Sequence, residues 1–404
     1  MHEPLIYHLK IRDYFFGQKK TWEFFASAKT KKEQINEYKI DLLKNCYKFD
    51  PSAEKEIYEK VERVKAALRL DLLQVTVYQS QNTEEVNASV VYFENEACLV
   101  FSGPILRMLN DDELLSVIAH ELSHIQLYNL LSGDLEITDR IITAIANNPQ
   151  SEGSYFETAR LFKLYTEIFC DRGALIVLGK TEPVITSLVK IATSLDKVNA
   201  ESYVRQAEEI FTTEKNTKAA TVSHPENFIR ARAIHLWHTG PKTAEKEITR
   251  MIEGVADLDQ LDILKQIELS KLTRKFLQLF LKPKWFRTNV VKNQALQFFP
   301  DFAGDEQALF APEILDQVEA SHHSIKEYLC YLLLDFILVD QSLEIVPFGW
   351  GFQFAEEIGL KKTFDEIVTR EFKYSLKKLQ QHKQKSLEAY YAVKESASEQ
   401  IYQD

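Results

Sequence analysis

The motif H-E-x-x-H, formed by His120, Glu121 and His124, constrains this 404-residue chain more than any other feature of its sequence. It lies in a stretch patterned as a helix, and Asn110 and Glu113 are placed to form a capping box at the start of that helix. On a helix the two histidines project from one face and can hold a single zinc ion, with the glutamate beside them. The spacing therefore predicts a zinc site of the kind that hydrolyses peptide bonds.

A second helix-patterned segment, from about Tyr155 to Leu178, supplies a third candidate ligand in Glu167. A carboxylate among apolar neighbours is unfavourable unless it pairs or binds a metal, and zinc would satisfy it. Asp171 lies one turn later on the same face, where it can accept a hydrogen bond from the far ring nitrogen of zinc-bound His120. The alternative is that both acids lie on a solvated face and pair with neighbouring basic residues.

Together these motifs resemble a known family. Residues 109–125, the ExxxD motif from Glu167 to Asp171, and His224-Pro225 followed by Arg230 are similar to the gluzincin metallopeptidases of the HtpX and CaaX prenyl protease type, metallopeptidase family forty-eight. The resemblance covers residues 70 to 235. By resemblance, one zinc ion (Zn2+) per chain is bound by His120, His124 and Glu167, the general base is Glu121, and the substrate or developing oxyanion is contacted by His224 and Arg230.

A physical argument also favours a functional role for His224. Pro225 restricts the residue before it to an extended or turn conformation and begins the next helix, which is predicted from Glu226 to Trp237. A histidine at that position can point into a cleft and stabilise an oxyanion. The alternatives are that His224 is an exposed turn residue and that Arg230 is a surface charge.

The chain as a whole is predicted to have an α+β fold that is mostly α. Residues 1–254 are expected to form a zincin-like metallopeptidase domain with a small antiparallel sheet, made of strands near Leu73–Tyr78, Ser89–Phe93 and Ala97–Ser102. Residues 255–404 are expected to form an all-α domain. By resemblance, the strand just before the zinc helix, Ala97–Ser102, would lie along the cleft and pair with the substrate backbone; the alternative is an ordinary edge strand covered by a loop.

The remaining helices are read from hydrophobic periodicity. Two of them, Thr21–Cys46 and Pro51–Leu70, precede the strands. In the second domain, residues from Ser324 to Phe372 are faintly similar to the TerB-like helical domains, and the alternative is a generic helical bundle. These C-terminal helices could recruit a protein partner.

Composition limits the other classes of function. The formal net charge of -11 comes without a basic motif or stripe, so nucleic acid is not an expected partner. The start of the chain lacks an apolar signal region, and no window approaches 18 uninterrupted apolar residues, so neither a secretory signal nor a membrane span is predicted. The four cysteines form no CxxC pair and suit a reduced, cytoplasmic compartment; they are Cys46, Cys98, Cys170 and Cys330. Cys170 is predicted to point away from the zinc.

These observations predict a soluble zinc metalloendopeptidase that acts on a protein or peptide substrate. Two alternatives stay open. One is a peptidase-like scaffold or binding protein with vestigial catalysis, which the intact Glu121 and complete ligand set argue against. The other is a zinc-dependent hydrolase of something other than peptides.

Overall fold

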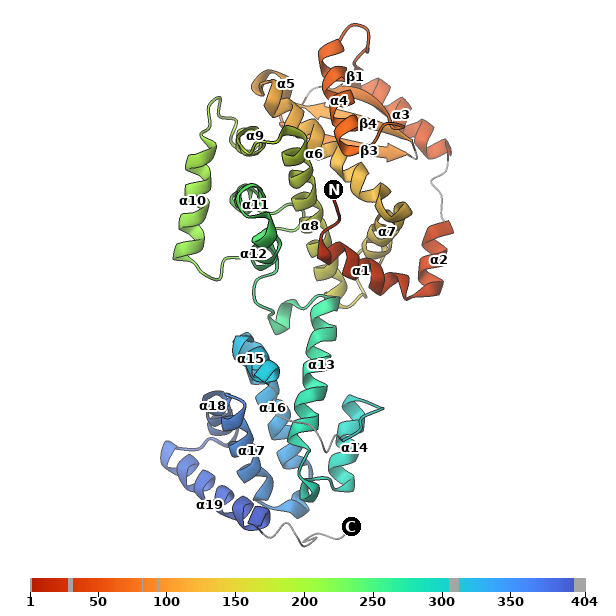
Figure 1. The fold of residues 1–404 in the computed structure, drawn as a ribbon. Helices are drawn as coiled ribbons and strands as arrows, with labels where there is room; N and C mark the ends of the chain where they lie inside the picture. Colours follow the sequence, from red (N-terminus) through yellow and green to blue (C-terminus); the bar gives the residue numbers. More distant parts are fainter. Residues whose placement is uncertain (1, 28–31, 82, 94, 305–311, 396–404) are drawn as a thin grey trace. The chain divides into compact units, whose positions relative to one another are not determined.

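A computed structural model describes the chain except for residues 1, 28–31, 82, 94, 305–311 and 396–404 (Figure 1). The chain divides into two compact units, Met1–Gly254 and Val255–Asp404. The division falls after Gly254, which is also where the sequence analysis placed the boundary between the two domains.

The first unit is mostly helical and contains one small sheet (Figure 1). Its elements in chain order are α1 (Ile6–Phe16), α2 (Lys19–Ser27), α3 (Lys32–Asn45), β1 (Cys46–Lys48), α4 (Lys55–Leu68), β2 (Gln74–Ser80), β3 (Asn87–Phe93), β4 (Glu96–Ser102), α5 (Ile105–Met108), α6 (Asp111–Asn129), η1 (Leu130–Gly133), α7 (Asp134–Ala146), α8 (Gly153–Leu178), α9 (Glu182–Thr193), α10 (Ala200–Thr213), α11 (Asn227–Thr239) and α12 (Pro241–Glu253). The helix predicted over Thr21–Cys46 corresponds to α2 and α3, and Cys46 instead begins a strand.

The sheet is mixed, so the prediction of an antiparallel sheet was wrong. Its strand order is β1-β2-β4-β3, with β2 parallel to β4 and the other two pairs antiparallel. The reason lies in β4, whose residues from Ala97 to Phe101 are all buried. A continuous apolar run suits a central strand that is covered on both faces, so β4 lies between β2 and β3.

This order also corrects the prediction about substrate pairing. Both edges of β4 are already bonded to neighbouring strands, so Ala97–Ser102 cannot add a further strand. The edge strand on that side of the sheet is β3, which is partly exposed along its length. β3 therefore offers the backbone edge that the sequence analysis assigned to β4.

Helices α6 and α8 pack closely at one small residue. A Cβ atom built on Gly173 of α8 would lie 2.0 Å from the Ser123 hydroxyl oxygen of α6 and 2.9 Å from a ring carbon of His2. Side chains at position 173 larger than hydrogen would therefore push the two helices apart. Because Ser123 adjoins His124, this contact sets the spacing of the two helices that carry the candidate ligands.

The N-terminal segment packs on α8 through two buried histidines. The His2 ring stacks on Phe169 and bonds the Phe169 carbonyl at 3.0 Å. The His8 ring is fully buried against Phe162 and Tyr165. Sequence reasoning assigned no element to this segment, whose helix α1 has only weak amphipathic periodicity.

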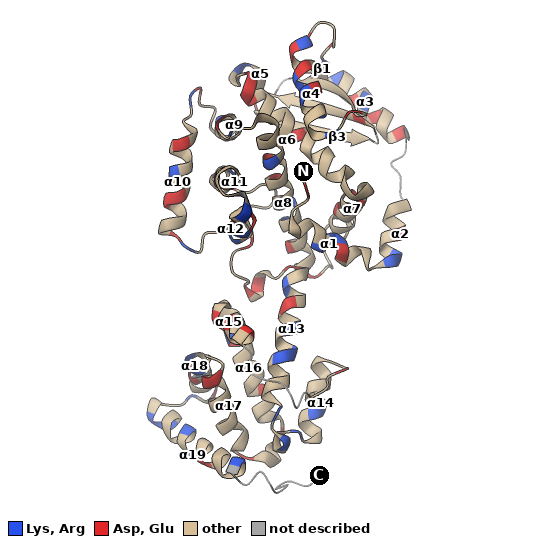
Figure 2. Cartoon of the chain, viewed as in Figure 1, with Lys and Arg blue, Asp and Glu red and all other residues tan. Residues whose placement is uncertain are grey.

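The second unit is helical throughout its described residues. Its elements are η2 (Leu258–Gln260), α13 (Ile263–Phe280), η3 (Lys284–Phe286), α14 (Asn289–Phe298), α15 (Pro312–Ala320), α16 (His323–Val339), η4 (Gln341–Leu343), α17 (Val346–Glu357), α18 (Lys361–Phe372) and α19 (Leu376–Glu395). A shared apolar core includes Phe276, Phe336 and Phe354. Along α10 of the first unit and α13 of the second, acidic and basic residues are interspersed (Figure 2). Among the described residues, no helix is both long and apolar enough to cross a membrane.

Acid is expected to destabilise the first unit partly through His2 and His8. Burial lowers the pKa of His2 to about 4 and that of His8 to about 3, from an ordinary value of 6.5. Both histidines bind protons more readily in the unfolded chain, so their stabilising contribution is complete above pH 6.5 and is lost as pH falls towards the folded pKa. Urea titrations should show the free energy of unfolding falling by roughly 1 kcal/mol per pH unit for each histidine between about pH 6 and 4, most steeply near pH 5.

The variant His8→Phe isolates this contribution from that of the carboxylates, which also lose stability in acid. It keeps an aromatic ring against Phe162 and Tyr165 but cannot titrate. The slope of stability against pH should be shallower than in the parent chain by the share of one histidine. An unchanged slope would contradict the assignment.

Candidate active site

Helix α6 is held firmly at its first turn. The Asn110 side chain accepts a hydrogen bond from the Glu113 backbone N–H at 3.0 Å, and the Glu113 carboxylate accepts one from the Asn110 N–H at 2.9 Å. These two bonds form the predicted capping box. The Lys190 ammonium of α9 also donates to the Glu113 carboxylate at 2.9 Å, and both side chains are buried. Sequence reasoning missed this ion pair, because no motif links two residues 77 positions apart.

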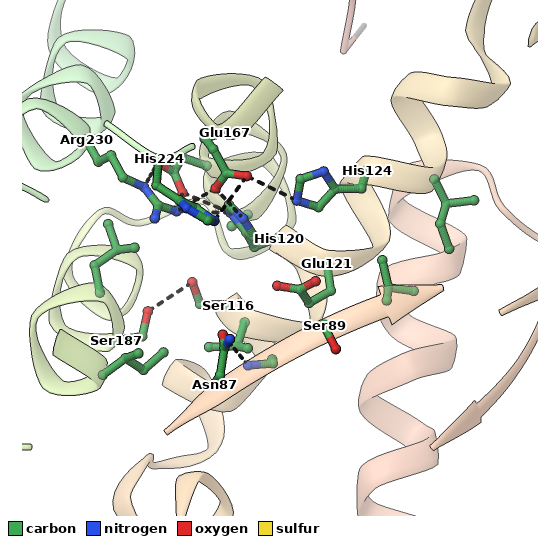
Figure 3. A pocket seen from close by; sticks show the side chains of 18 of the residues that line it. Asn87, Ser89, Ser116, His120, Glu121, His124, Glu167, Ser187, His224 and Arg230 are labelled. Atoms are coloured by element: carbon green, nitrogen blue, oxygen red, sulfur yellow. Dashed lines mark hydrogen bonds and ion pairs between the residues drawn. The ribbon is translucent and has the colours of Figure 1, made fainter. Parts of the chain in front are cut away.

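The three candidate ligands converge at one place. The Nε2 atom of His120 lies 3.3 Å from Oε2 of Glu167, and Nε2 of His124 lies 3.6 Å from Oε1 of the same carboxylate. Figure 3 shows Glu167 reaching from α8 towards both imidazoles of α6, with Glu121 between this group and Ser89 of β3. The structure thus brings together the residues that the sequence placed 43 to 47 positions apart.

The Glu167 carboxylate has the properties of a metal ligand. Its Oε2 atom is buried and takes no hydrogen bond of good geometry from the described residues. Burial raises the pKa of Glu167, but the close polar contact with His120 and its charge, with smaller effects from His124 and Arg230, hold it well below its usual range. An ionised, buried carboxylate facing two imidazole nitrogens fits the Glu/His donor set of a catalytic zinc site.

Asp171 holds the other ring nitrogen of His120. Its Oδ1 atom lies 3.0 Å from His120 Nδ1. A proton on Nδ1 donated to Asp171 turns Nε2 towards Glu167, which is the orientation that metal ligation requires. Burial lowers the pKa of His120, but Asp171 and Glu167 outweigh it and raise the pKa to about 10. Binding of zinc at Nε2 must therefore displace a proton from this ring.

Arg230 is directed towards Asp171. Its Nε and Nη2 atoms donate to the two carboxylate oxygens of Asp171 at 2.8 and 2.6 Å, and its side chain is 9% exposed. A bidentate pair of this kind fixes the carboxylate in orientation as well as in charge. Burial raises the pKa of Asp171, but Arg230 outweighs it and keeps the aspartate ionised. The structure therefore places Arg230 behind His120, in support of Asp171.

His224 lies at the rim of the site and is 61% exposed. Its Nε2 atom is 3.7 Å from Oε1 of Glu167, and its Nδ1 atom is 2.9 Å from the Ser223 hydroxyl. Helix α11 begins three residues later, at Asn227, close to the predicted start at Glu226. An exposed imidazole beside the ligands is placed to meet a molecule that enters the cleft.

Cys170 is closer to the ligands than the sequence analysis expected. One donor atom each from His120, His124 and Cys170 lie within 4.8 Å of one another. The thiol is nevertheless fully buried, and burial raises its pKa well above the usual range, so it remains protonated. Since a thiol must ionise to bind zinc, the carboxylate of Glu167 is the better third ligand of the two.

Glu121 has the proton affinity of an acid–base group. Burial raises its pKa to about 7, against a partly compensating effect of His120. Burial also lowers the pKa of His124 to about 4, so this imidazole is neutral at pH 7, as a ligand must be. A carboxylate that titrates near the working pH can both accept and return a proton.

A cleft of about 830 Å³ is lined by the three candidate ligands and by Glu121, Asp171, His224 and Arg230. The edge strand β3 forms one wall, from Asn87 to Tyr92. A second wall is apolar and comes mainly from α9, through Val184, Leu188 and Ile191. Sequence reasoning did not single out α9, whose apolar periodicity alone could not show that part of its apolar face lines a cleft.

Comparison with known proteins agrees with this arrangement. Residues 51–238 match the family model described as peptidase family M48. Family M48 consists of zinc metallopeptidases, in which H-E-x-x-H is typical, and the matched range contains α6, α8, the loop of His224, and Arg230. The match supports a metallopeptidase, while the HtpX type and the TerB-like resemblance stay predictions.

One known protein is similar to the chain over a shorter stretch. A protein named CAAX prenyl protease 1 homolog, from Arabidopsis thaliana, is 29% identical to the chain over 82 residues. The aligned stretch is 20% of this chain and 19% of that protein. The chain therefore spans about a fifth of the relative's length.

Replacing Asp171 by Asn is expected to weaken zinc binding by about 10- to 100-fold, as the loss of an outer-shell partner typically does. The amide keeps the shape of the side chain but lowers the basicity of the His120 ring. Competition with a fluorescent zinc chelator measures the affinity. Asp139→Asn is a matched control, because Asp139 also lines the cleft yet bonds the Tyr128 hydroxyl and no imidazole. Equal zinc affinities of the parent chain, Asp171→Asn and Asp139→Asn would contradict the role given to Asp171.

Proposed function

We propose that this protein is a zinc-dependent endopeptidase with one zinc ion per chain, held by His120, His124 and Glu167. The observation that carries the proposal is the convergence of two imidazole nitrogens on one buried carboxylate, at 3.3 and 3.6 Å from its oxygens. Three protein ligands leave a coordination position open, as a catalytic site requires. The match of residues 51–238 to peptidase family M48 supports the same chemistry.

A zinc ion held there would supply a Lewis acid that polarises the scissile carbonyl and activates water for attack. Glu121 is the proposed general base: it takes a proton from the attacking water and returns it to the leaving amine. Its pKa of about 7 suits both transfers at neutral pH. His224, at the exposed rim, is the proposed donor to the oxyanion that develops on the substrate. Arg230 is proposed to act through Asp171, which it keeps ionised and oriented towards His120.

The cleft walls suggest how a peptide is held. An extended peptide can pair with the free edge of β3 through backbone hydrogen bonds, which select little by sequence. Beside the catalytic group, the apolar wall of Val184, Leu188 and Ile191 favours an apolar substrate side chain. We therefore propose extended protein segments with an apolar residue next to the scissile bond as the substrate class.

Two further expectations belong to this proposal. All four cysteines are buried and free, which suits a reducing compartment such as the cytoplasm. Recruitment of a protein partner by the second unit stays a prediction from the sequence.

The variant Glu121→Gln tests the base. It should bind one zinc ion per chain, measured by atomic emission, while kcat on casein falls by about 10²- to 10⁴-fold because no group accepts the water proton. Glu136→Gln is the matched control, since Glu136 lines the same cleft and pairs with Arg140. Full activity of the Glu121→Gln variant would remove Glu121 as the base, and zinc without cleavage in the parent chain would favour the scaffold alternative.

Peptides blocked at both ends test the mode of cleavage. An acetylated and amidated peptide of about ten residues should be cut internally, since pairing with β3 needs only the backbone. Exhaustive chelation should abolish cleavage, and added zinc should restore it. Cleavage confined to peptides with a free terminus would rule out an endopeptidase.

A further inference from the structure

We propose that Arg160 is a positioning residue, which holds the loop that carries His224 against α8 and thereby sets where His224 lies in the cleft. The inference rests on the proposed function, because it concerns the oxyanion role given there to His224. Arg160 is not part of any motif in the sequence. It lies on α8, seven residues before Glu167.

The contact between Arg160 and the loop is made through backbone carbonyls. The Nη1 atom of Arg160 donates to the carbonyl oxygen of Ala219 at 3.2 Å and to that of Thr221 at 3.0 Å. These carbonyls lie two residues apart, so one guanidinium nitrogen bridges the loop where it passes α8. Both hydrogen bonds go to backbone carbonyls, so the contact constrains the path of the chain.

The guanidinium is itself held in one orientation. Its Nε and Nη2 atoms donate to the two carboxylate oxygens of Glu157 at 2.7 Å each. The side chains of Arg160 and Glu157 are only 15% and 17% exposed. Because three of its nitrogens are used in fixed directions, the planar guanidinium does what a lysine ammonium could do only in part.

The loop transmits this constraint to His224. The Thr221 hydroxyl donates a hydrogen bond to the His224 carbonyl oxygen. The Ala220 N–H donates to the Glu226 carboxylate at 3.0 Å, across the turn that contains His224. The turn from Ala219 to Glu226 is thus closed on itself, so fixing two of its carbonyls fixes the base of the His224 side chain.

Helix α8 therefore relates His224 to the ligand Glu167. Seven residues are close to two helical turns, so Arg160 and Glu167 project from nearly the same face of α8. One end of this face supplies the carboxylate, and the other supplies the anchor of the loop. The distance of 3.7 Å between His224 Nε2 and Glu167 Oε1 therefore depends on both of these residues of α8, Glu167 and Arg160.

A double-mutant cycle on kcat tests the inference. His224→Ala should lower kcat by about 10²- to 10³-fold, the usual effect of removing one oxyanion donor. Arg160→Ala should lower kcat by about 10- to 100-fold through misplacement of that donor. Both variants should keep the KM and zinc content of the parent chain, because the contact is made in the transition state. In the double variant, loss of Arg160 should cost nothing beyond the loss of His224.

Further variants separate positioning from general stability. Arg232→Ala is the matched control, because Arg232 is also 15% exposed and paired with a glutamate, Glu208, yet belongs to α11. It should keep the parent kcat. Arg160→Lys should recover part of the lost activity and serves as the test protein if Arg160→Ala does not fold. Trypsin should cut after Lys218 faster in the Arg160 variants than in the parent, and no faster in His224→Ala.

Two results would overturn the inference and are told apart from failure of the proposed function. If His224→Ala is impaired but Arg160→Ala is not, or if the two losses multiply, only the positioning role is wrong. If His224→Ala keeps the full kcat, the oxyanion role is wrong and the positioning role falls with it. The tests of zinc and Glu121 stand apart from both results.

Discussion

The rest of the first unit depends on the interactions that compensate the ionised carboxylate of Glu167, which is buried between helices. A lone carboxylate in such surroundings costs several kcal/mol, and the cost is offset only where cationic or metal partners face it. Here the cationic partners are the His120 imidazole, at 3.3 Å, and the Arg230 guanidinium, at 3.7 Å. The close packing at Gly173 and Ser123 keeps α6 near enough to α8 for this pairing. Charge and packing thus require the same helix spacing.

A series of ion pairs and hydrogen bonds surrounds the candidate ligands. Arg230 forms an ion pair with Asp171, and Asp171 is hydrogen-bonded to the His120 ring. On the other side, Glu157 orients Arg160, which bonds the loop that leads to His224. His120 and the loop of His224 each contact a neighbour that is itself held by an ion pair, as precise positioning requires.

The sequence was most informative where one helix or one spacing decides the outcome. The capping box at Asn110 and the helix around Glu167 could both be read locally. Strand order could not, because the position of β4 between β2 and β3 depends on pairing between distant segments. Its unbroken apolar run was the one available signal. The orientation of Arg230 towards Asp171 was beyond reach for the same reason, since its partner lies 59 residues earlier.

The buried pair of Lys190 and Glu113 has a consequence for substrate choice. It ties α9, which carries the apolar wall, to the first turn of α6, the helix that bears the histidines, so the wall is anchored at that contact. We expect a wall anchored there to adjust to a substrate mainly through side-chain rotamers. Discrimination among peptides would then depend mainly on the shape that the apolar wall already has.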